Sequence, residues 1–370
     1  MLEKFIAKIT KKIVDQLNQL EAGASELSSE HNFISNSFYH ERRRGFIVSV
    51  TTRCNFQCPH CLRTKVDKNK TLIKDLSPNV FEIILREGKK INFSHISFTG
   101  GEPILHPQFK ELVSLVSKYG YKFNLTSNGW LYKEYWEIIR QNHENFELMF
   151  LSLDGTTAEV HNTVRNKPGS FERLMEAIKF YRNRNLPLII TFCATKKNCH
   201  QIENLPELCL KLGIKHIKWA AAVPVYGQSC VASSEYILAD DERIEALQKI
   251  LNLQKRFKEK CTFLLTQSYF PVSGDRIILC PVLDGHTFYI DHDGAMLFCC
   301  DINRECKNKP LIQRIGFKKA LEITLDSANE MKKKVFDSSL DNQKIARMCD
   351  FCNENIESCL DSAVRRQSCG

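Results

Sequence analysis

Short apolar runs and amphipathic stretches alternate along residues 45–221, and this alternation leaves few folds open. The runs rich in β-branched and aromatic residues predict strands, and the stretches between them carry apolar residues at helical spacing. Repeats of strand, helix and strand build parallel sheets with right-handed crossovers. The predicted strands are 45–50, 93–99, 121–126, 146–153, 187–193 and 215–221, and the predicted helices lie around 78–90, 107–118, 132–142, 170–184 and 201–212.

The predicted strands are apolar on both faces, as a sheet covered by helices requires. Periodicity does not choose between an open doubly wound sheet and a barrel. A further helix is predicted at 239–259, and the alternation stops after it. Residues 270–370 are rich in cysteine and short of regular periodicity, which indicates a small domain held by metal. Residues 2–20 predict an amphipathic helix, followed by a polar linker. Its docking on the main domain is favoured, and a membrane-surface helix is the alternative.

Composition and charge exclude several classes of protein. The 370 residues are 43% hydrophobic and 26% charged, as in ordinary globular proteins. No apolar run is long enough to cross a bilayer, and the N-terminus does not resemble a signal peptide, so we expect a cytoplasmic protein. The net charge of +9 comes from scattered basic residues. Because aromatic residues are not interleaved with them, the pattern does not favour nucleic-acid binding.

Sixteen cysteines are many for a chain without a signal peptide, and in a reducing cytosol they indicate metal or catalytic sites rather than disulfides. Cys54, Cys58 and Cys61 follow the first predicted strand directly. Residues 62–85 contain no Cys or His, so the second ligand pair of a zinc ribbon is missing. Three thiolates in one loop can hold three irons of a cubic 4Fe–4S cluster and leave the fourth iron to a non-protein ligand. The isolated Cys193 and Cys209 are predicted to be small core residues.

This Cys-x3-Cys-x2-Cys loop, placed after the first strand, resembles that of the radical S-adenosylmethionine (SAM) enzymes. In that family the amino and carboxylate groups of SAM chelate the open iron. The resemblance covers roughly residues 45–230 and implies a partial (β/α)6 TIM-like barrel. It departs from the family in having His60 before Cys61, where Tyr or Phe is usual.

Motifs at the ends of the later strands extend the resemblance. They are "FTGGEP" (98–103), "LTSNG" (125–129), "LSLDG" (151–155), "HNTVRNKPGSF" (161–171) and "PVYGQS" (224–229), the last resembling a loop near the adenine. The carboxyl ends of parallel strands carry ligand sites in such folds. The implied SAM contacts are Gly100 and Gly101 for close backbone approach, Glu102 for the amino group, Ser127 and Asn128 for the carboxylate or ribose, Asp154 for a ribose hydroxyl, and Arg165 for the carboxylate.

The C-terminal cysteines resemble the auxiliary-cluster domains called SPASM and twitch. Residues 287–299 read as a hairpin with Asp-Gly at its tip. A full SPASM pattern has a further Cys five residues after the CxxC pair and another three residues later, whereas here Cys359 follows after six residues and Cys369 comes near the C-terminus. We therefore expect one auxiliary 4Fe–4S cluster, and the four expected ligands are Cys280, Cys299, Cys349 and Cys352.

Two alternatives remain open for this second group. A structural zinc ion fits four thiolates equally well. Two auxiliary clusters would also use Cys300 or Cys306 together with Cys359 and Cys369.

The predicted organisation of the whole chain has four parts. They are an N-terminal helix and linker at 1–44, a radical SAM partial barrel at 45–238, a bridging helix and linker at 239–269, and an auxiliary-cluster domain at 270–370.

The resemblance implies an enzyme that cleaves SAM reductively and abstracts hydrogen from an organic substrate. We expect oxidation or epimerisation of a small molecule such as a sugar or aminocyclitol, because only 44 residues precede the first strand, too few for a leader-binding domain. Epimerisation needs a hydrogen donor, for which Cys300 and Cys306 are the candidate catalytic thiols. The expected partners are this substrate or a short peptide, and a reductant such as flavodoxin or ferredoxin. The alternatives are a maturase of ribosomally made peptides and a non-catalytic iron–sulfur or zinc protein on the same scaffold.

Overall fold

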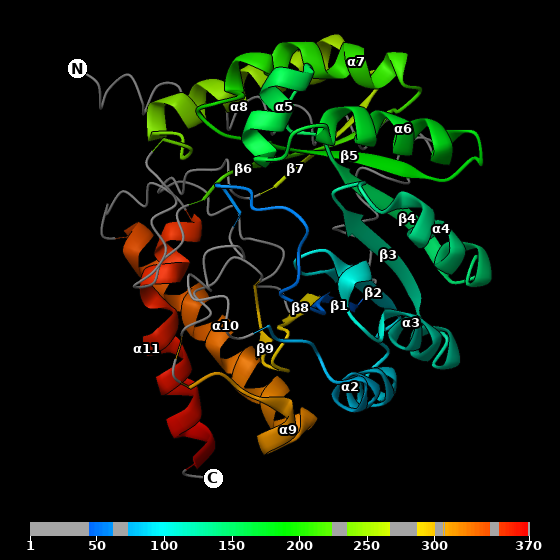
Figure 1. Ribbon diagram of the computed structural model, residues 1–370. Coiled ribbons are helices and arrows are strands. Elements are labelled where there is room, and N and C mark those ends of the chain that lie inside the picture. Colours follow the sequence, from blue (N-terminus) through cyan, green and yellow to red (C-terminus); the bar gives the residue numbers. More distant parts are fainter. Residues whose placement is uncertain are drawn as a thin grey trace.

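The computed structural model describes residues 44–61, 73–223, 235–266, 287–299, 306, 308–340 and 348–368. Nine strands form one sheet in the order β7-β6-β5-β4-β3-β2-β1-β8-β9, and every neighbouring pair is parallel except β8 and β9 (Figure 1). The predicted helix at 2–20 lies outside the described residues. The strands are β1 (Gly45–Ser49), β2 (His95–Thr99), β3 (Lys122–Ser127), β4 (Phe146–Ser152), β5 (Leu188–Ala194), β6 (His216–Ala221), β7 (Thr262–Leu265), β8 (Thr287–Ile290) and β9 (Met296–Leu297).

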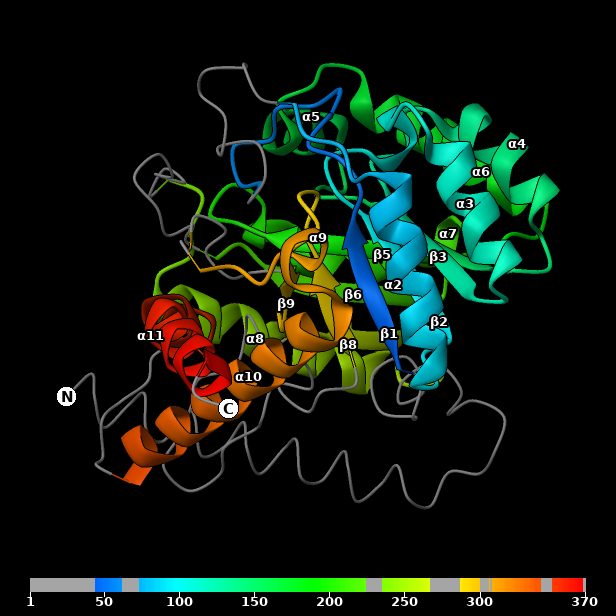
Figure 2. The ribbon, with the colours of Figure 1, turned by 90° about the horizontal axis from the view of Figure 1, so that it is seen from below.

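The sheet is curved, and the helices cover its convex face (Figures 1 and 2). β1 to β6 and the helices between them confirm the predicted alternation, and the fold is the predicted partial TIM-like barrel. The helices are α2 (Pro78–Lys90), α3 (Phe109–Lys118), α4 (Tyr132–Gln141), α5 (Ala158–Arg165), α6 (Ser170–Arg182), α7 (Leu205–Lys211), α8 (Asp240–Arg256), α9 (Ile312–Ile315), α10 (Phe317–Leu340) and α11 (Met348–Ser368), with 3-10 turns at Pro103–Leu105 and Cys199–Asn204. None of the described helices is long and apolar enough to cross a membrane.

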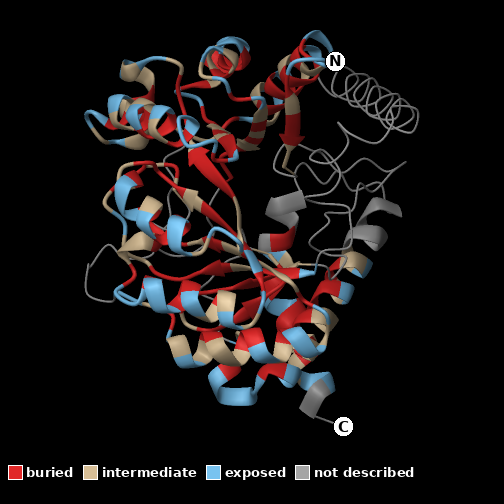
Figure 3. Cartoon of the chain, turned by 90° about the vertical axis from the view of Figure 1, so that its right-hand side faces the viewer, coloured by how far each residue is buried: buried red, intermediate tan, exposed pale blue. Residues whose placement is uncertain are grey.

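The main core lies between the sheet and these helices, where the strands and the inward sides of the helices are buried (Figure 3). Phe98 of β2 is at its centre and is fully buried. Its ring centroid lies 5.8 Å from that of Phe81 on α2, 5.3 Å from that of Phe109 on α3 and 5.9 Å from that of Phe123 on β3. Tilted and edge-to-face contacts of this kind add to the free energy of apolar burial. This cluster fixes how α2 and α3 sit on the sheet.

Phe98→Ala should therefore lower the free energy of unfolding by about 3–5 kcal/mol, because it removes a buried ring and leaves a cavity. Urea unfolding followed by circular dichroism measures this loss. Ile73→Ala is the matched control, since Ile73 is 55% exposed and should change stability little. Equal losses in the two variants would contradict the central place of Phe98 in the core.

The C-terminal part of the chain continues the same sheet. The predicted hairpin is confirmed: β8 pairs antiparallel with β9, and Gly294 in the turn has φ +77°. β8 also pairs in parallel with β1, and β7, from the predicted bridging segment, pairs in parallel with β6. The sheet thus crosses the predicted boundaries at 238/239 and 269/270, and the division into domains stays a prediction.

The second half of residues 270–370, which the sequence marked as short of regular periodicity, contains two long helices. α10 has 24 residues and α11 has 21, and the two pack along each other (Figures 1 and 2). The buried face of α10 includes Ala320, Thr324, Ser327 and Ala328. Thr324 Oγ1 donates to the carbonyl oxygen of Ala320 at 2.7 Å and lies 2.9 Å from that of Met296 on β9. Phe317, Ile323 and Met331 on α10 are buried as well, so the sequence carries an apolar helical pattern here that the prediction did not use.

Candidate active site

The cysteine loop, residues 50–61, leaves the carboxyl end of β1 and is held from two sides. On one side, Gly101 N donates to Thr51 O and Glu102 N donates to Arg53 O, both at 2.7 Å. On the other side, the guanidinium of Arg53 makes a bidentate ion pair with Asp75, with N–O distances of 2.9–3.1 Å. The sequence motif after β2 therefore supports the loop that carries Cys54, Cys58 and Cys61.

The two glycines of this motif are required by that contact. A Cβ on Gly101 would lie 2.0 Å from Arg53 O, and a Cβ on Gly100 would lie 2.7 Å from Thr51 O. Gly100 also has a φ of +143°, a backbone conformation that residues other than glycine rarely adopt. The sequence predicted a close approach of this backbone to a ligand. In the structure the close approach is to the backbone of the cysteine loop.

Gly101→Ala should displace the cysteine loop, because the new methyl group overlaps a backbone carbonyl that cannot rotate away. We expect the variant to lose most of its iron after anaerobic reconstitution, as measured by iron analysis. Gly169→Ala is the control: it also has a positive φ, +74°, but its Cβ would meet nothing within 4 Å. A Gly101→Ala protein with full iron content would show that the loop does not depend on this contact.

Glu102 is almost completely buried, with 1% of its surface exposed. Its Oε1 accepts hydrogen bonds from Ser127 Oγ at 2.6 Å and from Tyr135 Oη at 2.7 Å, and its Oε2 accepts one from Asn128 N at 3.0 Å. Burial raises the pKa of Glu102 above its ordinary value, although these three hydrogen bonds act in the opposite direction. The carboxylate is thus held in one orientation by residues of β3, of the turn after it and of α4.

Ser127 and Asn128 make their described contacts within the protein. Ser127 Oγ accepts a hydrogen bond from Gly129 N at 3.0 Å in addition to donating to Glu102. Asn128 Nδ2 donates to Asn55 Oδ1 at 2.8 Å, and Asn55 belongs to the cysteine loop. The end of β3 therefore joins the GGEP motif to the loop. Direct contacts of these two residues with SAM stay a prediction.

Asp154, at the end of β4, connects four elements. Its Oδ2 lies 3.0 Å from Arg165 Nη1 on α5 and 3.6 Å from His60 Nε2 in the cysteine loop, and its Oδ1 accepts from Cys193 N on β5 at 2.8 Å. Burial alone would raise the pKa of Asp154, but the charge of Arg165 and the other partners outweigh it, so the pKa is lowered. Asp154 is an ionised anchor of the site, and its predicted contact with a ribose stays a prediction.

Arg165 lies against the cysteine loop. Its guanidinium carbon is 5.6 Å from the ring centroid of Phe56, which lies between Cys54 and Cys58. Nη1 is bound to Asp154, but the buried Nε has no hydrogen-bond partner among the described residues. Its positive charge lowers the pKa of Cys58, although burial raises that pKa overall, to about 11. A buried cation with an unused donor beside three thiols fits an anionic group bound at this loop.

Asp154→Ala should lower the free energy of unfolding by about 3–5 kcal/mol, because it leaves the charge of Arg165 buried without its partner. Chemical unfolding of the variant and the parent protein measures the difference. Glu137→Ala breaks the ion pair with Arg140, whose side chains are 55% and 58% exposed, and should change stability little. An Asp154→Ala protein as stable as the Glu137→Ala protein would contradict the anchoring role.

The three loop cysteines differ in burial, and their arrangement is compatible with a cubic cluster. Cys58 is buried, Cys61 is partly buried and Cys54 is exposed. Within the described residues, no three Cys, His, Asp or Glu side chains converge as ligands of one metal ion do. In a cubic cluster each thiolate binds a different iron, so convergence on one point is not required. Burial raises the pKa of the Cys58 thiol to about 11, and binding of iron would deprotonate it.

Of the four predicted auxiliary ligands, the structure brings two together. Cys352 is buried in a cluster of apolar residues from the end of the hairpin, α10 and α11, and Cys299 packs against it. Cys280 lies outside the described residues, and of Cys349 only the backbone, in α11, is described. These ligand assignments therefore stay predictions.

The same apolar cluster contains Cys306 and Cys359. Cys306 is 3% exposed, and burial raises the pKa of its thiol to about 12. Cys359 is fully buried, and it lies seven residues, or two helical turns, after Cys352 on one face of α11. That spacing was the signal by which the sequence could have placed it. Cys300, the other candidate hydrogen donor, lies outside the described residues.

The two isolated cysteines differ. Cys209 is fully buried on α7, which confirms it as a core residue. Cys193 is only partly buried, and its backbone nitrogen donates to Asp154, so it is a neighbour of the site that sequence reasoning missed.

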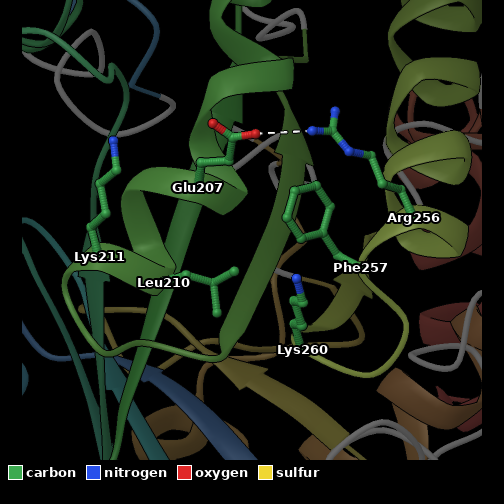
Figure 4. Close-up of a pocket in the computed structure, with 6 residues that line it drawn as sticks. All are labelled: Glu207, Leu210, Lys211, Arg256, Phe257 and Lys260. Atoms are coloured by element: carbon green, nitrogen blue, oxygen red, sulfur yellow. Dashed lines mark hydrogen bonds and ion pairs between the residues drawn. The ribbon is translucent and has the colours of Figure 1, made fainter.

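A hollow of about 390 Å³ between α7 and α8 is lined by Glu207, Leu210, Lys211, Arg256, Phe257 and Lys260 (Figure 4).

This hollow does not belong to the cysteine site. Its lining residues are at the carboxyl ends of α7 and α8, just before β6 and β7 begin, which is the opposite edge of the sheet from the cysteine loop. The ion pair of Arg256 with Glu207, with an N–O distance of 3.0 Å, crosses it (Figure 4). The chemistry-bearing residues gather instead at the carboxyl ends of β1 to β4.

Comparison with known proteins gives the class. Residues 48–209 match the model of the Radical SAM superfamily, so this part of the chain is a radical SAM domain. The resemblance inferred from the cysteine loop is confirmed. A domain of this class works with a 4Fe–4S cluster and SAM, which confirms the two predicted cofactors of the barrel.

Particular relatives show how far the similarity extends. The AdoMet-dependent heme synthase of Methanosarcina barkeri is 28% identical over 226 residues, or 60% of this chain and 62% of that protein. The sporulation killing factor maturation protein SkfB of Bacillus subtilis is 26% identical over 166 residues, or 45% of this chain and 39% of that protein. The chain spans 55–62% of the length of three heme synthases that it matches.

Solved structures share the fold over more of the chain. A structure of anSMEcpe with bound AdoMet has a TM-score of 0.61 at 17% identity, and the match covers 88% of this chain and 98% of that one. Streptococcus suis SuiB bound to S-adenosylmethionine has a TM-score of 0.57 at 16% identity, covering 83% of this chain and 74% of that one. The shared fold therefore extends beyond the radical SAM domain.

Proposed function

We propose that this protein is an enzyme that cleaves SAM reductively and abstracts a hydrogen atom from an organic substrate. The observation that carries the proposal is that Glu102 and Arg165 both contact the cysteine loop, Glu102 through its backbone amide on Arg53 and Arg165 at the ring of Phe56. A carboxylate and a guanidinium match the ammonium and carboxylate groups of an amino acid. When bound, the cluster and SAM supply a 5′-deoxyadenosyl radical, the oxidant of the reaction.

The residues of the chain bind and orient in this scheme. Cys54, Cys58 and Cys61 hold the cluster, Glu102 takes the ammonium group of SAM, and Arg165 takes its carboxylate. Asp154 orients the guanidinium of Arg165 through their ion pair, in which the N–O distance is 3.0 Å. A non-catalytic scaffold would not need this pair of opposite charges beside the thiols, so the alternative of an inactive iron–sulfur or zinc protein is less well supported.

The substrate would lie over the concave face of the sheet. Leu148, Phe150, Ile189 and Leu264 form a separate apolar cluster there. They alternate along β4, β5 and β7 with residues of the main core, so they face away from the helices. Lys218 Nζ lies 5.3 Å from the ring centroid of Phe150 on this face. A mixed apolar and cationic wall suits an organic substrate with an anionic or polar group.

Peptide modification is the second candidate for the substrate class, and it fits as well as a small molecule. Its support is the match to anSMEcpe with bound AdoMet and Cp18Cys peptide, which covers 87% of this chain and 99% of that one. The match to the heme synthases is confined to 55–62% of those proteins. Nothing in the site favours a sugar, so the expected sugar or aminocyclitol has no support beyond the motif resemblance. A cytoplasmic location and a flavodoxin or ferredoxin reductant stay predictions.

An auxiliary cluster near Cys299 and Cys352 is part of the proposal. It would accept the second electron if the reaction is an oxidation, whereas Cys300 or Cys306 would donate hydrogen in an epimerisation. The burial of Cys306 beside Cys299 and Cys352 is compatible with a ligand as well as with a donor. The iron content of a Cys306→Ala protein separates a ligand role of Cys306 from a hydrogen-donor role.

Anaerobically reconstituted protein should contain about eight irons, four for each 4Fe–4S cluster. With SAM and a strong reductant it should form 5′-deoxyadenosine, which liquid chromatography measures. Cys54→Ala should abolish this product, and Cys209→Ala, which changes a buried cysteine on α7, is the matched control and should retain it. No product above the level of Cys54→Ala would sink the proposed function, and about four irons with one zinc would support a structural zinc site instead.

A further inference from the structure

Tyr135 contacts the candidate site through the side chain of Glu102. It lies on α4, is fully buried, and its ring packs edge-to-face on Phe109 with centroids 6.1 Å apart. Its hydroxyl donates to Glu102 Oε1 at 2.7 Å and accepts a hydrogen bond from Ile104 N at 3.1 Å. Both partners belong to the segment that follows the two glycines. The phenol therefore contacts the segment that carries Glu102.

The hydrogen bonds of Glu102 are distributed unevenly between its two oxygens. Oε1 accepts two, from Ser127 Oγ and Tyr135 Oη, whereas Oε2 accepts one, from Asn128 N. An ionised carboxylate has about four acceptor positions. The two hydroxyl donors thus occupy Oε1 and fix the plane of the carboxylate. Oε2 retains capacity for one more donor.

We propose that Tyr135 is a positioning residue that holds the Glu102 carboxylate in the orientation required by the ammonium group of SAM. This inference rests on the proposed function, because it concerns the same site. In this proposal Tyr135 contacts neither SAM nor the cluster, and it acts only through Glu102. Loss of its hydroxyl leaves Oε1 with a single donor and allows the carboxylate to rotate within a buried site, so that Oε2 no longer points to its ligand.

The competing explanation is that Tyr135 is one more buried tyrosine that satisfies its hydroxyl. Tyr121 and Tyr181 are also fully buried, and their hydroxyls donate to the backbone carbonyl oxygens of Leu85 at 2.9 Å and Tyr132 at 3.0 Å. Tyr135 differs because its acceptor is the carboxylate of a predicted ligand-binding residue. Tyr121 precedes β3, at the opposite end of the strand from Ser127, and serves as the matched control.

The test compares Tyr135→Phe with Tyr121→Phe in the reconstituted full-length protein. Each change removes one buried hydroxyl and keeps the ring, so both variants should fold. Equilibrium dialysis with SAM under anaerobic conditions should give a dissociation constant about ten-fold higher for Tyr135→Phe, since a hydrogen bond to a charged group is lost near the ligand. Tyr121→Phe should bind SAM as the parent protein does, and equal affinities in the two variants would overturn the proposal.

A double-mutant cycle then separates positioning from general destabilisation. Glu102→Gln should weaken SAM binding, and adding Tyr135→Phe to it should change the dissociation constant less than two-fold, because the carboxylate to be positioned is gone. Additive losses would show that Tyr135 does not act through Glu102 and would overturn the inference while the proposed function stands. Failure of the parent protein itself to bind SAM would overturn the proposed function, and with it the role of Tyr135.

Discussion

The contact between the Gly100–Gly101 turn and the backbone of the cysteine loop is the constraint on which the site depends. The carbonyl oxygen of Arg53 lies where a side chain at Gly101 would begin. The amide groups of Gly101 and Glu102 bind that loop directly, so one short segment both supports the three cysteines and sets the position of Glu102. Under the proposed function, this segment would couple metal ligation to recognition of the amino group of SAM through backbone geometry.

Buried charges complete the site. Glu102 and Asp154 are both 1% exposed, and such groups are tolerated only with partners that replace water. Glu102 obtains hydrogen-bond donors from β3, the turn after it and α4, while Asp154 obtains an ion pair with Arg165 and a backbone amide from β5. Because each carboxylate is held by several elements, its orientation does not depend on any single contact.

The C-terminal segment is joined to the barrel rather than appended to it. β8 extends the sheet beyond β1, the strand that carries the cysteine loop, and α10 packs on β9. Cys299 follows β9 by two residues, so the predicted auxiliary ligands are connected to the edge of the barrel by a short hairpin. A second cluster held there would be rigidly placed relative to the first, which suits electron transfer from a substrate between them.

The sequence by itself determined the alternating strands and helices, the three-cysteine loop and the order of the motifs after it, because local periodicity and spacing encode them. It did not reveal that β7 and β8 extend the sheet, since short strands acquire their partners only from distant segments. Nor did it reveal that Ser127 and Tyr135 share one oxygen of Glu102, or that Asp154 binds Arg165, His60 and the amide of Cys193. Most of those contacts join residues far apart in the chain. The pairing of β2 with β3 and of β4 with β5 brings their ends together, and the curvature of the sheet also brings the loop after β1 to the end of β4.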